Sequence, residues 1–374
     1  MMSLSWPFWD HQPLRAAPRA HFLNVGAGAV LFDERAQQIF ELNDTSEAIW
    51  GAIGVRGTIA GAAILLGDGD ASATVLDHVR AAAAQWLELG LLRPADLPAR
   101  PGEPTDVRLA WMACRVGLKL FGAIDAAPLR QVFAALRSTE APDHFLDIRE
   151  MEGLVFIEDS DGGSCVRTPA SWIPEVKARL TARVLKSTTT GFLAHAALLS
   201  RGGQGMLICG DPGAGKTTLS VSLLAAGFGC HSDDIVWISE AGEAVGAPFA
   251  PAIKAGGWPL LEEMSPGAAT SEIYLRSDGQ QVRYLLPPAA AQQVPLPIGA
   301  ILLLARGEES PPRIEAVTPL EVLTAVLGSA YAARGAISAA GLKSLADVIG
   351  KARIGRLRYS DWRDGRRLVE ALAA

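Results

Sequence analysis

The stretch GDPGAGKTTLS, from Gly210 to Ser220, decides how the second half of the chain folds. Its first eight residues match the pattern G-x-x-x-x-G-K-[ST] in full, with Lys216 and Thr217 at the last two positions. The apolar run GMLICG before it predicts a strand, and TTLSVSLLAAG after it predicts a helix. Strand, glycine-rich loop and helix form the context in which this pattern binds a chain of phosphates.

The residue types of this loop match that chemistry. Gly213 and Gly215 let backbone N–H groups approach the phosphates, and the helix N-terminus adds positive potential. A chance glycine-rich turn is the alternative, and the full match in context argues against it. We therefore predict ATP and Mg²⁺ as ligands, with Lys216 on the terminal phosphates, Thr217 on the metal, and nucleotide contacts from Gly210, Asp211, Pro212, Gly213, Ala214, Gly215, Lys216, Thr217 and Thr218.

Two adjacent carboxylates follow the loop. Asp233 and Asp234 stand in CHSDDIVWIS, at the front of the next apolar run. Neighbouring residues on a strand point to opposite faces, so one carboxylate can face a metal and the other an acceptor hydroxyl. An acidic residue at this place commonly holds Mg²⁺. We assign the metal to Thr217 and Asp234, and we leave open which aspartate is the base. A solvated turn is the alternative.

A histidine precedes the loop. His195 stands in FLAHAALLS, at the start of a predicted strand, and is our third catalytic candidate beside the two aspartates and Lys216. A hydrogen-bonded core histidine is the alternative interpretation. His231 is a rival because it lies close to the aspartates in the sequence.

Composition narrows the class of protein. The chain has 374 residues, 49% of them hydrophobic, which is enough for two domains. A formal net charge of −6 argues against nucleic-acid binding by bulk electrostatics. No apolar run approaches the ~18 residues that span a bilayer. The N-terminus lacks a secretory pattern and the four cysteines show no metal spacing. We expect a cytoplasmic protein, and homo-oligomerisation stays open.

A proline-rich stretch divides the chain. PADLPARPGEPT, residues 94–105, holds four prolines and predicts a linker between domains at 1–93 and 106–374. Before it, HFLNVG, GAVLFD and QQIFELN predict three strands. Asp44 and Glu47 form a capping-box pattern at the start of a helix, and a second helix ends at Gly90. This order predicts an α+β, winged-helix-like unit.

After the linker, residues 107–124 and 127–138 have apolar residues at helical spacing and predict helices. HFLDIREMEGLVFIED predicts two strands, and SWIPEVKARLTARVLKS predicts a helix. From Ala194 onward strands and helices alternate, which indicates an α/β core.

The pieces of the second half together resemble the catalytic domain of the HPr kinase/phosphorylase family. That family has a histidine upstream of a GxSGxGKS loop and an Asp-Asp pair on the following strand; here His195, GDPGAGKT and SDD stand in the same order. The resemblance is good over 194–238 and weak over 106–374. It implies an α/β phosphate-loop kinase domain in which Lys216 binds the β- and γ-phosphates and His195 pairs with the acidic site.

The sequence also departs from that family. Thr217-Thr218 replaces the usual Ser-Glu, and the signature for phosphorolysis is not visible, so neither the reverse reaction nor the protein HPr as substrate is implied. The tail looks like the divergent HPr-kinase-like proteins of peptide-modification pathways. Three basic residues in it are candidate phosphate or substrate contacts, with surface charges as the alternative: Lys254, Arg276 and Arg283.

The N-terminal unit resembles PqqD-like precursor-recognition domains, through FELNDTSEAIW at 40–50 and WLELGLL at 86–92. Such domains capture the leader of a precursor peptide as an added strand, because an open strand edge carries unpaired N–H and C=O groups. A DNA-binding winged helix is one alternative, but its helix would offer only His78 and Arg80; a structural appendage is another. The predicted leader contacts are Ile39, Phe40, Glu41, Leu76 and Arg80.

The two resemblances together predict an ATP-dependent kinase that phosphorylates a Ser or Thr hydroxyl of a ribosomally made precursor peptide, with lasso-type precursors as the first candidates. One alternative is enzymatic: ATP activates a peptide carboxyl or phosphorylates another substrate. The other is an ATP-gated protein that binds and delivers the peptide without phosphorylating it.

Overall fold

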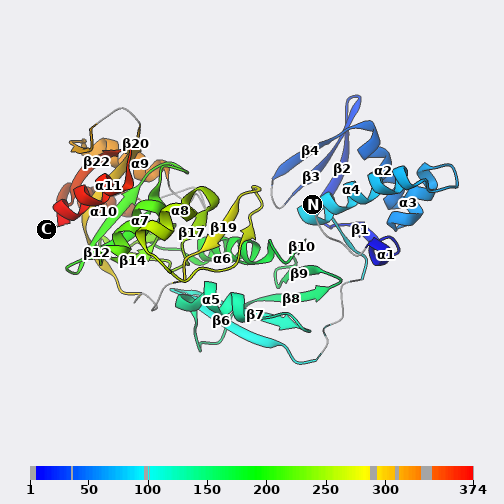
Figure 1. The fold of residues 1–374 in the computed structure, drawn as a ribbon, viewed down its shortest axis with the longest axis horizontal. Coiled ribbons are helices and arrows are strands. Elements are labelled where there is room, and N and C mark those ends of the chain that lie inside the picture. Colours follow the sequence, from blue (N-terminus) through cyan, green and yellow to red (C-terminus); the bar gives the residue numbers. More distant parts are fainter. Residues whose placement is uncertain are drawn as a thin grey trace. The chain divides into compact units, whose positions relative to one another are not determined.

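The computed structural model describes residues 6–34, 37–96, 100, 102–286, 293–307, 311–329 and 339–373 (Figure 1). They divide into two compact units, which we describe separately. The first comprises Met1–Val107, Val116–Ala126 and Asp143–Glu175, and the second comprises Arg108–Arg115, Ala127–Pro142 and Val176–Ala374. The chain therefore passes between the units more than once.

The first unit opens with a small α+β module. Its elements are α1 (Trp6–Trp9), β1 (Leu14–Ala16), β2 (Ala20–Val25), β3 (Gly28–Asp33), β4 (Gln38–Leu42), α2 (Asp44–Arg56), α3 (Ile59–Leu66), α4 (Ala73–Leu89) and β5 (Leu92–Pro94). Three strands pair in the order β2-β3-β4, so β4 is an edge of this sheet among the described residues, and β1 pairs with β5. The predicted order of strands and helices is confirmed; the likeness to a winged helix stays a prediction.

The helix caps of this module are only partly as predicted. Asn43, rather than Asp44, caps α2: its side-chain oxygen accepts a hydrogen bond from the Ser46 N–H at 2.8 Å. The predicted capping box is therefore wrong by one residue, since Asp44 already lies in the first helical turn. Gly90 ends α4 as predicted, in the left-handed conformation with φ at 70°.

Strands replace a predicted helix after the proline-rich stretch. The segment contains β6 (Thr105–Trp111), β7 (Cys114–Phe121), β8 (His144–Met151), β9 (Leu154–Asp159) and β10 (Ser164–Arg167), with β7 to β10 paired in the order β10-β9-β8-β7. The helix predicted over 107–124 is wrong, because the burial in β6 repeats every second residue: Val107 and Leu109 are buried and Arg108 is exposed. The two strands predicted over 144–159 are confirmed.

One hydrophobic core joins the N-terminal helices to this sheet. The Trp9 ring stacks on Phe156 of β9 with centroids 6.1 Å apart, and Leu154 and Val166 belong to the same core. Pro94 and Thr105, the two ends of the predicted linker, lie in β5 and β6, and residues 97–99 and 101 are outside the described residues. The proposed domain boundary at residue 93 stays a prediction, and residues 1–93 expressed alone would lack the part of this core that β9 and β10 supply.

Two helical predictions before residue 190 have different outcomes. Residues 127–138 form the short helix α5 (Ala127–Val132) and a 3₁₀ turn (Ala134–Leu136) instead of one helix. The helix predicted over 171–187 is confirmed as α6 (Trp172–Ser187).

The second unit contains a large mixed sheet with helices. Its strands and helices are β11 (Phe192–His195), β12 (Ala197–Arg201), β13 (Gln204–Cys209), α7 (Lys216–Ala225), β14 (Gly229–Ser232), β15 (Ile235–Ile238), β16 (Glu243–Gly246), β17 (Ala252–Lys254), a 3₁₀ turn (Ala255–Gly257), α8 (Trp258–Met264), β18 (Tyr274–Leu275), β19 (Gln281–Tyr284), β20 (Leu296–Arg306), β21 (Arg313–Glu315), α9 (Pro319–Gly328), α10 (Ala339–Lys351), β22 (Arg353–Tyr359) and α11 (Trp362–Ala373). The main path runs β11-β15-β16-β20-β13-β12-β14, with β22 parallel to β20.

Helices cover both faces of this sheet. Along β20, Ile301 and Leu303 share a hydrophobic core with α9 and α10, whereas Leu302 and Leu304 share another with α7 and α11. This alternation of burial has the period of a strand that is buried on both sides. The predicted α/β core is therefore confirmed, and it fixes the strand ends that carry the candidate site.

Among the described residues, no single helix has the length and apolar composition needed to cross a bilayer, although the sharply bent pair α2–α3 meets the two criteria jointly.

Candidate functional site

The phosphate loop connects β13 to α7 in the second unit. Gly215 caps α7 with φ at 97°, and Gly213 has φ at 90°, a conformation that residues with a Cβ adopt only under strain. The Nζ atom of Lys216 donates to the Gly210 carbonyl at 2.6 Å and lies 3.4 Å from that of Asp211. Burial lowers the pKa of this lysine. Lys216 thus lies across the loop that its sequence pattern predicts to hold phosphates.

Asp233 faces the start of α7. The Thr217 hydroxyl donates to its Oδ2 atom at 3.2 Å, and only 6% of the residue is exposed. Its Oδ1 atom is buried and has no hydrogen-bond partner among the residues that the structure describes. Burial raises the pKa of Asp233. A buried acceptor without a partner costs about 1–3 kcal/mol, and a cation held between Thr217 and Asp233 would remove that cost.

Asp234 points to a different set of partners. Its Oδ1 atom lies 2.9 Å from Nδ1 of His195, and its Oδ2 atom accepts from Nζ of Lys177 at 3.2 Å. Its side chain is 23% exposed, more than that of Asp233. The two carboxylates therefore have separate environments, as predicted. The predicted reason is wrong, because Asp233 and Asp234 lie in the bend between β14 and β15 and not on a strand whose residues alternate between two faces.

His195 reaches the pair through strand pairing. It is the last residue of β11, not the first residue of a longer strand, so the predicted placement is wrong. In the antiparallel ladder of β11 and β15 it stands opposite Ile235, next to Asp234. The rival His231 has its Nε2 atom 2.7 Å from the Ser200 hydroxyl.

Ser232 shapes the turn that carries the acid pair, and sequence reasoning missed it. Its buried hydroxyl accepts hydrogen bonds from the N–H groups of Asp234 at 3.2 Å and Ile235 at 3.0 Å. Serine before two aspartates is a known turn-forming signal, so the sequence did contain a hint of this role.

Tyr359 and Arg306, which the sequence analysis did not single out, lie close to the phosphate loop at Gly215. A Cβ atom built on Gly215 would lie 3.4 Å from the Tyr359 hydroxyl and 3.9 Å from Cδ of Arg306. These residues end β22 and β20, and they are paired in the parallel ladder. Burial raises the pKa of Tyr359 to about 12, so its hydroxyl stays neutral.

The three basic candidates of the tail lie on or beside a small sheet of order β17-β19-β18. Lys254 ends β17 and is exposed. Arg276 pairs with Asp278 at 3.1 Å, and the guanidinium of Arg283 lies 4.7 Å from the centre of the Trp258 ring. The structure gives Arg276 and Arg283 local partners, and their role as substrate contacts stays a prediction.

The predicted leader contacts lie in the first unit. Ile39 is 67% exposed on the edge strand β4 and Glu41 is exposed beside it, whereas Phe40 packs against the core. Leu76 of α4 also packs against the core. Arg80 is held by Asp10, with a shortest distance of 2.6 Å, and by Asp77 at 3.2 Å. This pairing gives Arg80 a structural role in anchoring the N-terminal segment to α4.

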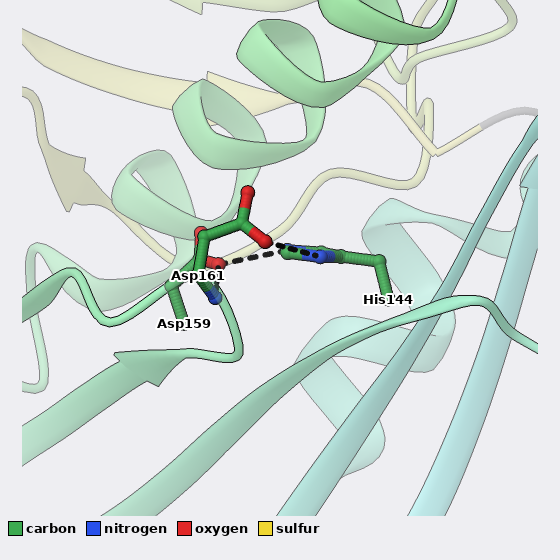
Figure 2. A group of neighbouring side chains, drawn as sticks. All are labelled: His144, Asp159 and Asp161. Atoms are coloured by element: carbon green, nitrogen blue, oxygen red, sulfur yellow. Dashed lines mark hydrogen bonds and ion pairs between the residues drawn. The ribbon is translucent and has the colours of Figure 1, made fainter.

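A second polar group lies in the first unit, where β8 begins and β9 ends (Figure 2). The Nε2 atom of His144 lies 2.9 Å from Asp159 Oδ1, and its Nδ1 atom lies 2.9 Å from the Ser160 hydroxyl and 3.7 Å from Asp161. Asp159 also accepts a hydrogen bond from the Asp161 N–H at 2.9 Å. Both ring nitrogens are engaged, so the group holds a turn, and we assign no metal to it.

Comparisons with known proteins add little to this geometry. No protein-family model and no curated protein matches the chain. A solved structure, the HPr(Ser) kinase/phosphatase from Coxiella burnetii, matches with 15% sequence identity over 48% of this chain and 92% of that one, at a TM-score of 0.23. A likeness this low carries no argument about fold or function.

Proposed function

We propose that the second unit transfers the γ-phosphoryl group of Mg·ATP to a hydroxyl group. One observation carries the proposal: beside a complete phosphate loop, two adjacent carboxylates have different partners. Asp233 is joined to the loop through Thr217, whereas Asp234 is joined to His195 and is more exposed. A kinase needs both a metal ligand and a base, and this arrangement provides one carboxylate for each.

Asp233, together with Thr217, is the metal ligand in this proposal. The sequence interpretation gave that place to Asp234, and the geometry leads us to exchange the two. Two observations support the exchange: Oδ1 of Asp233 has no partner within the described part of the chain, and Oδ2 of Asp233 accepts a hydrogen bond from Thr217. A bound Mg²⁺ would neutralise charge on the β- and γ-phosphates.

Asp234 is the base. The acceptor oxygen attacks the γ-phosphorus, the new O–P bond forms as the bond to the β-phosphate oxygen breaks, and the acceptor proton passes to Asp234. His195 holds Oδ1 of this carboxylate, which orients it. Lys216 and the N–H groups at the start of α7 stabilise the charge on the phosphates.

The acceptor in this proposal is a Ser or Thr hydroxyl of a precursor peptide, with lasso-type precursors as the first candidates. The position of β4 at the edge of its sheet, as far as the described residues extend, supports it, because an extended leader can pair with such a strand. A captured leader raises the effective concentration of the rest of the peptide near the enzyme. Since Arg80 is engaged by Asp10, we leave it out of the proposed leader contacts and keep Ile39, Phe40, Glu41 and Leu76.

The intact mass of the co-encoded peptide after incubation with the full chain, ATP and Mg²⁺ tests this function. We expect the mass of one or more phosphate groups to be added, with ADP released in proportion. An adenylated peptide would favour carboxyl activation. ADP formed with no change in peptide mass would favour an ATP-gated binding protein instead.

Replacing Ile39 with proline in the full chain is expected to weaken leader binding at least about tenfold. Proline removes a backbone donor from β4 and restricts the strand. Ile39→Ala is the matched control: it removes the exposed side chain but keeps the N–H group, so it should weaken binding only moderately. Fluorescence anisotropy of a labelled leader gives both affinities, and melting curves check that each variant is folded. Equal affinities of the two folded variants would argue against strand addition at β4.

A further inference from the structure

Lys177 is a largely buried lysine. It lies on α6, only 14% of its side chain is exposed, and its neighbours Val176 and Leu180 are buried. Removing an ammonium group from water costs several kcal/mol unless a partner compensates it. Here the partner is Oδ2 of Asp234, 3.2 Å away, and the Phe249 ring lies 5.5 Å from the ammonium. The lysine is therefore tied to the acid pair and not to solvent.

The contacts of Asp234 show what this tie can do. Nδ1 of His195 lies 2.9 Å from one carboxylate oxygen of Asp234 and 3.1 Å from its main-chain carbonyl oxygen. Lys177 contacts the other carboxylate oxygen, and contacts at both oxygens restrict rotation of the carboxylate about its last side-chain bond. This restriction directs the remaining lone pairs of the oxygens, one of which must receive the acceptor proton.

We propose that Lys177 is a positioning residue, which holds the Asp234 carboxylate toward the acceptor and away from the metal site at Asp233. The proposal rests on the function proposed above for Asp234. It adds a member to the site that lies outside the phosphate loop and outside β14 and β15, the strands on either side of the acid pair. The same contact explains why a lysine stands on a helix face whose neighbours are apolar.

Steady-state ATP hydrolysis by the full chain, with Mg²⁺ and with water as acceptor, provides the kinetic test. Lys177→Met keeps the length of the side chain and removes the charge, and we expect kcat to fall about 10- to 100-fold while KM for ATP stays within about twofold. Lys177→Arg restores a charged donor and should recover part of the loss. Lys343→Met, at an exposed lysine of α10, is the matched control and should leave both constants unchanged.

A measurement that needs no turnover separates the two proposals. The chain has 6 histidines, so ¹⁵N-histidine labelling gives a short spectrum in which a His195→Gln variant assigns His195. Lys177→Met is expected to shift the His195 Nδ1 signal, because the carboxylate that contacts it moves; Lys343→Met is not. An unchanged signal, or normal kcat in folded Lys177→Met, overturns the inference. A shifted signal in a protein that never consumes ATP would reject the proposed function and leave the positioning contact in place.

Discussion

Replacing Lys216 with alanine is expected to lower ATP turnover about 10²- to 10³-fold and to weaken ATP binding, while the melting temperature changes little. Lys216 opens α7 and its ammonium already lies over the loop carbonyl of Gly210 at 2.6 Å. With a nucleotide bound, the same ammonium can turn to the phosphates, where a fixed charge stabilises the transferring group. Truncation removes that charge without disturbing the strand or the helix.

Turnover by ADP release and affinity by a fluorescent ATP analogue measure the two effects separately. The matched control is Lys343→Ala, which removes an exposed lysine of α10 and changes the net charge of the protein by the same amount. It should retain wild-type turnover, which excludes a general effect of net charge. Normal turnover and normal ATP affinity in Lys216→Ala would mean that the loop does not bind the nucleotide as we propose.

The local parts of this site could be predicted from the sequence. The loop pattern, the strand before it, the helix after it and the position of Asp233 and Asp234 before β15 all depend on residues close together in the chain. Such signals come from steric and hydrogen-bonding preferences that act within a few residues. They were sufficient for the α/β class of the second unit as well.

Other parts depend on contacts between distant segments, which a single sequence does not show. Lys177 contacts Asp234 across 57 positions of the sequence, and nothing in the sequence pattern of α6 distinguishes this lysine from a solvated one. The sequence could not show which aspartate binds the metal for the same reason. Either aspartate fits that role in the sequence, and only the contacts with Thr217 and His195 distinguish them. The wrong helix prediction over 107–124 has a different cause. The apolar residues of this segment fit both a helical and a strand period, and pairing in a sheet selects the strand.

The partition of roles between the two aspartates predicts that their asparagine variants differ in kind. Asp234→Asn should keep Mg·ATP bound with near-normal affinity and lower turnover by about 10²-fold or more, because an amide cannot accept the acceptor proton. Asp233→Asn should lower turnover as well, but by raising the Mg²⁺ concentration needed for half-maximal activity. It also removes a buried carboxylate whose Oδ1 atom has no partner among the described residues.

Because the Asp233 carboxylate is buried, the thermal stability of Asp233→Asn tests its role independently of activity. Burial disfavours the charged form of Asp233 and raises its pKa, so a neutral side chain at this position is expected to raise the melting temperature in the absence of metal. Added Mg²⁺ and ATP should then stabilise the wild-type protein more than the variant. Asp234→Asn loses its contacts with Lys177 and His195 instead and should melt at a lower temperature. If Asp234→Asn shifted the Mg²⁺ requirement and Asp233→Asn did not, the two roles would be exchanged; if neither variant lost turnover, the pair would be a solvated turn with no part in the reaction.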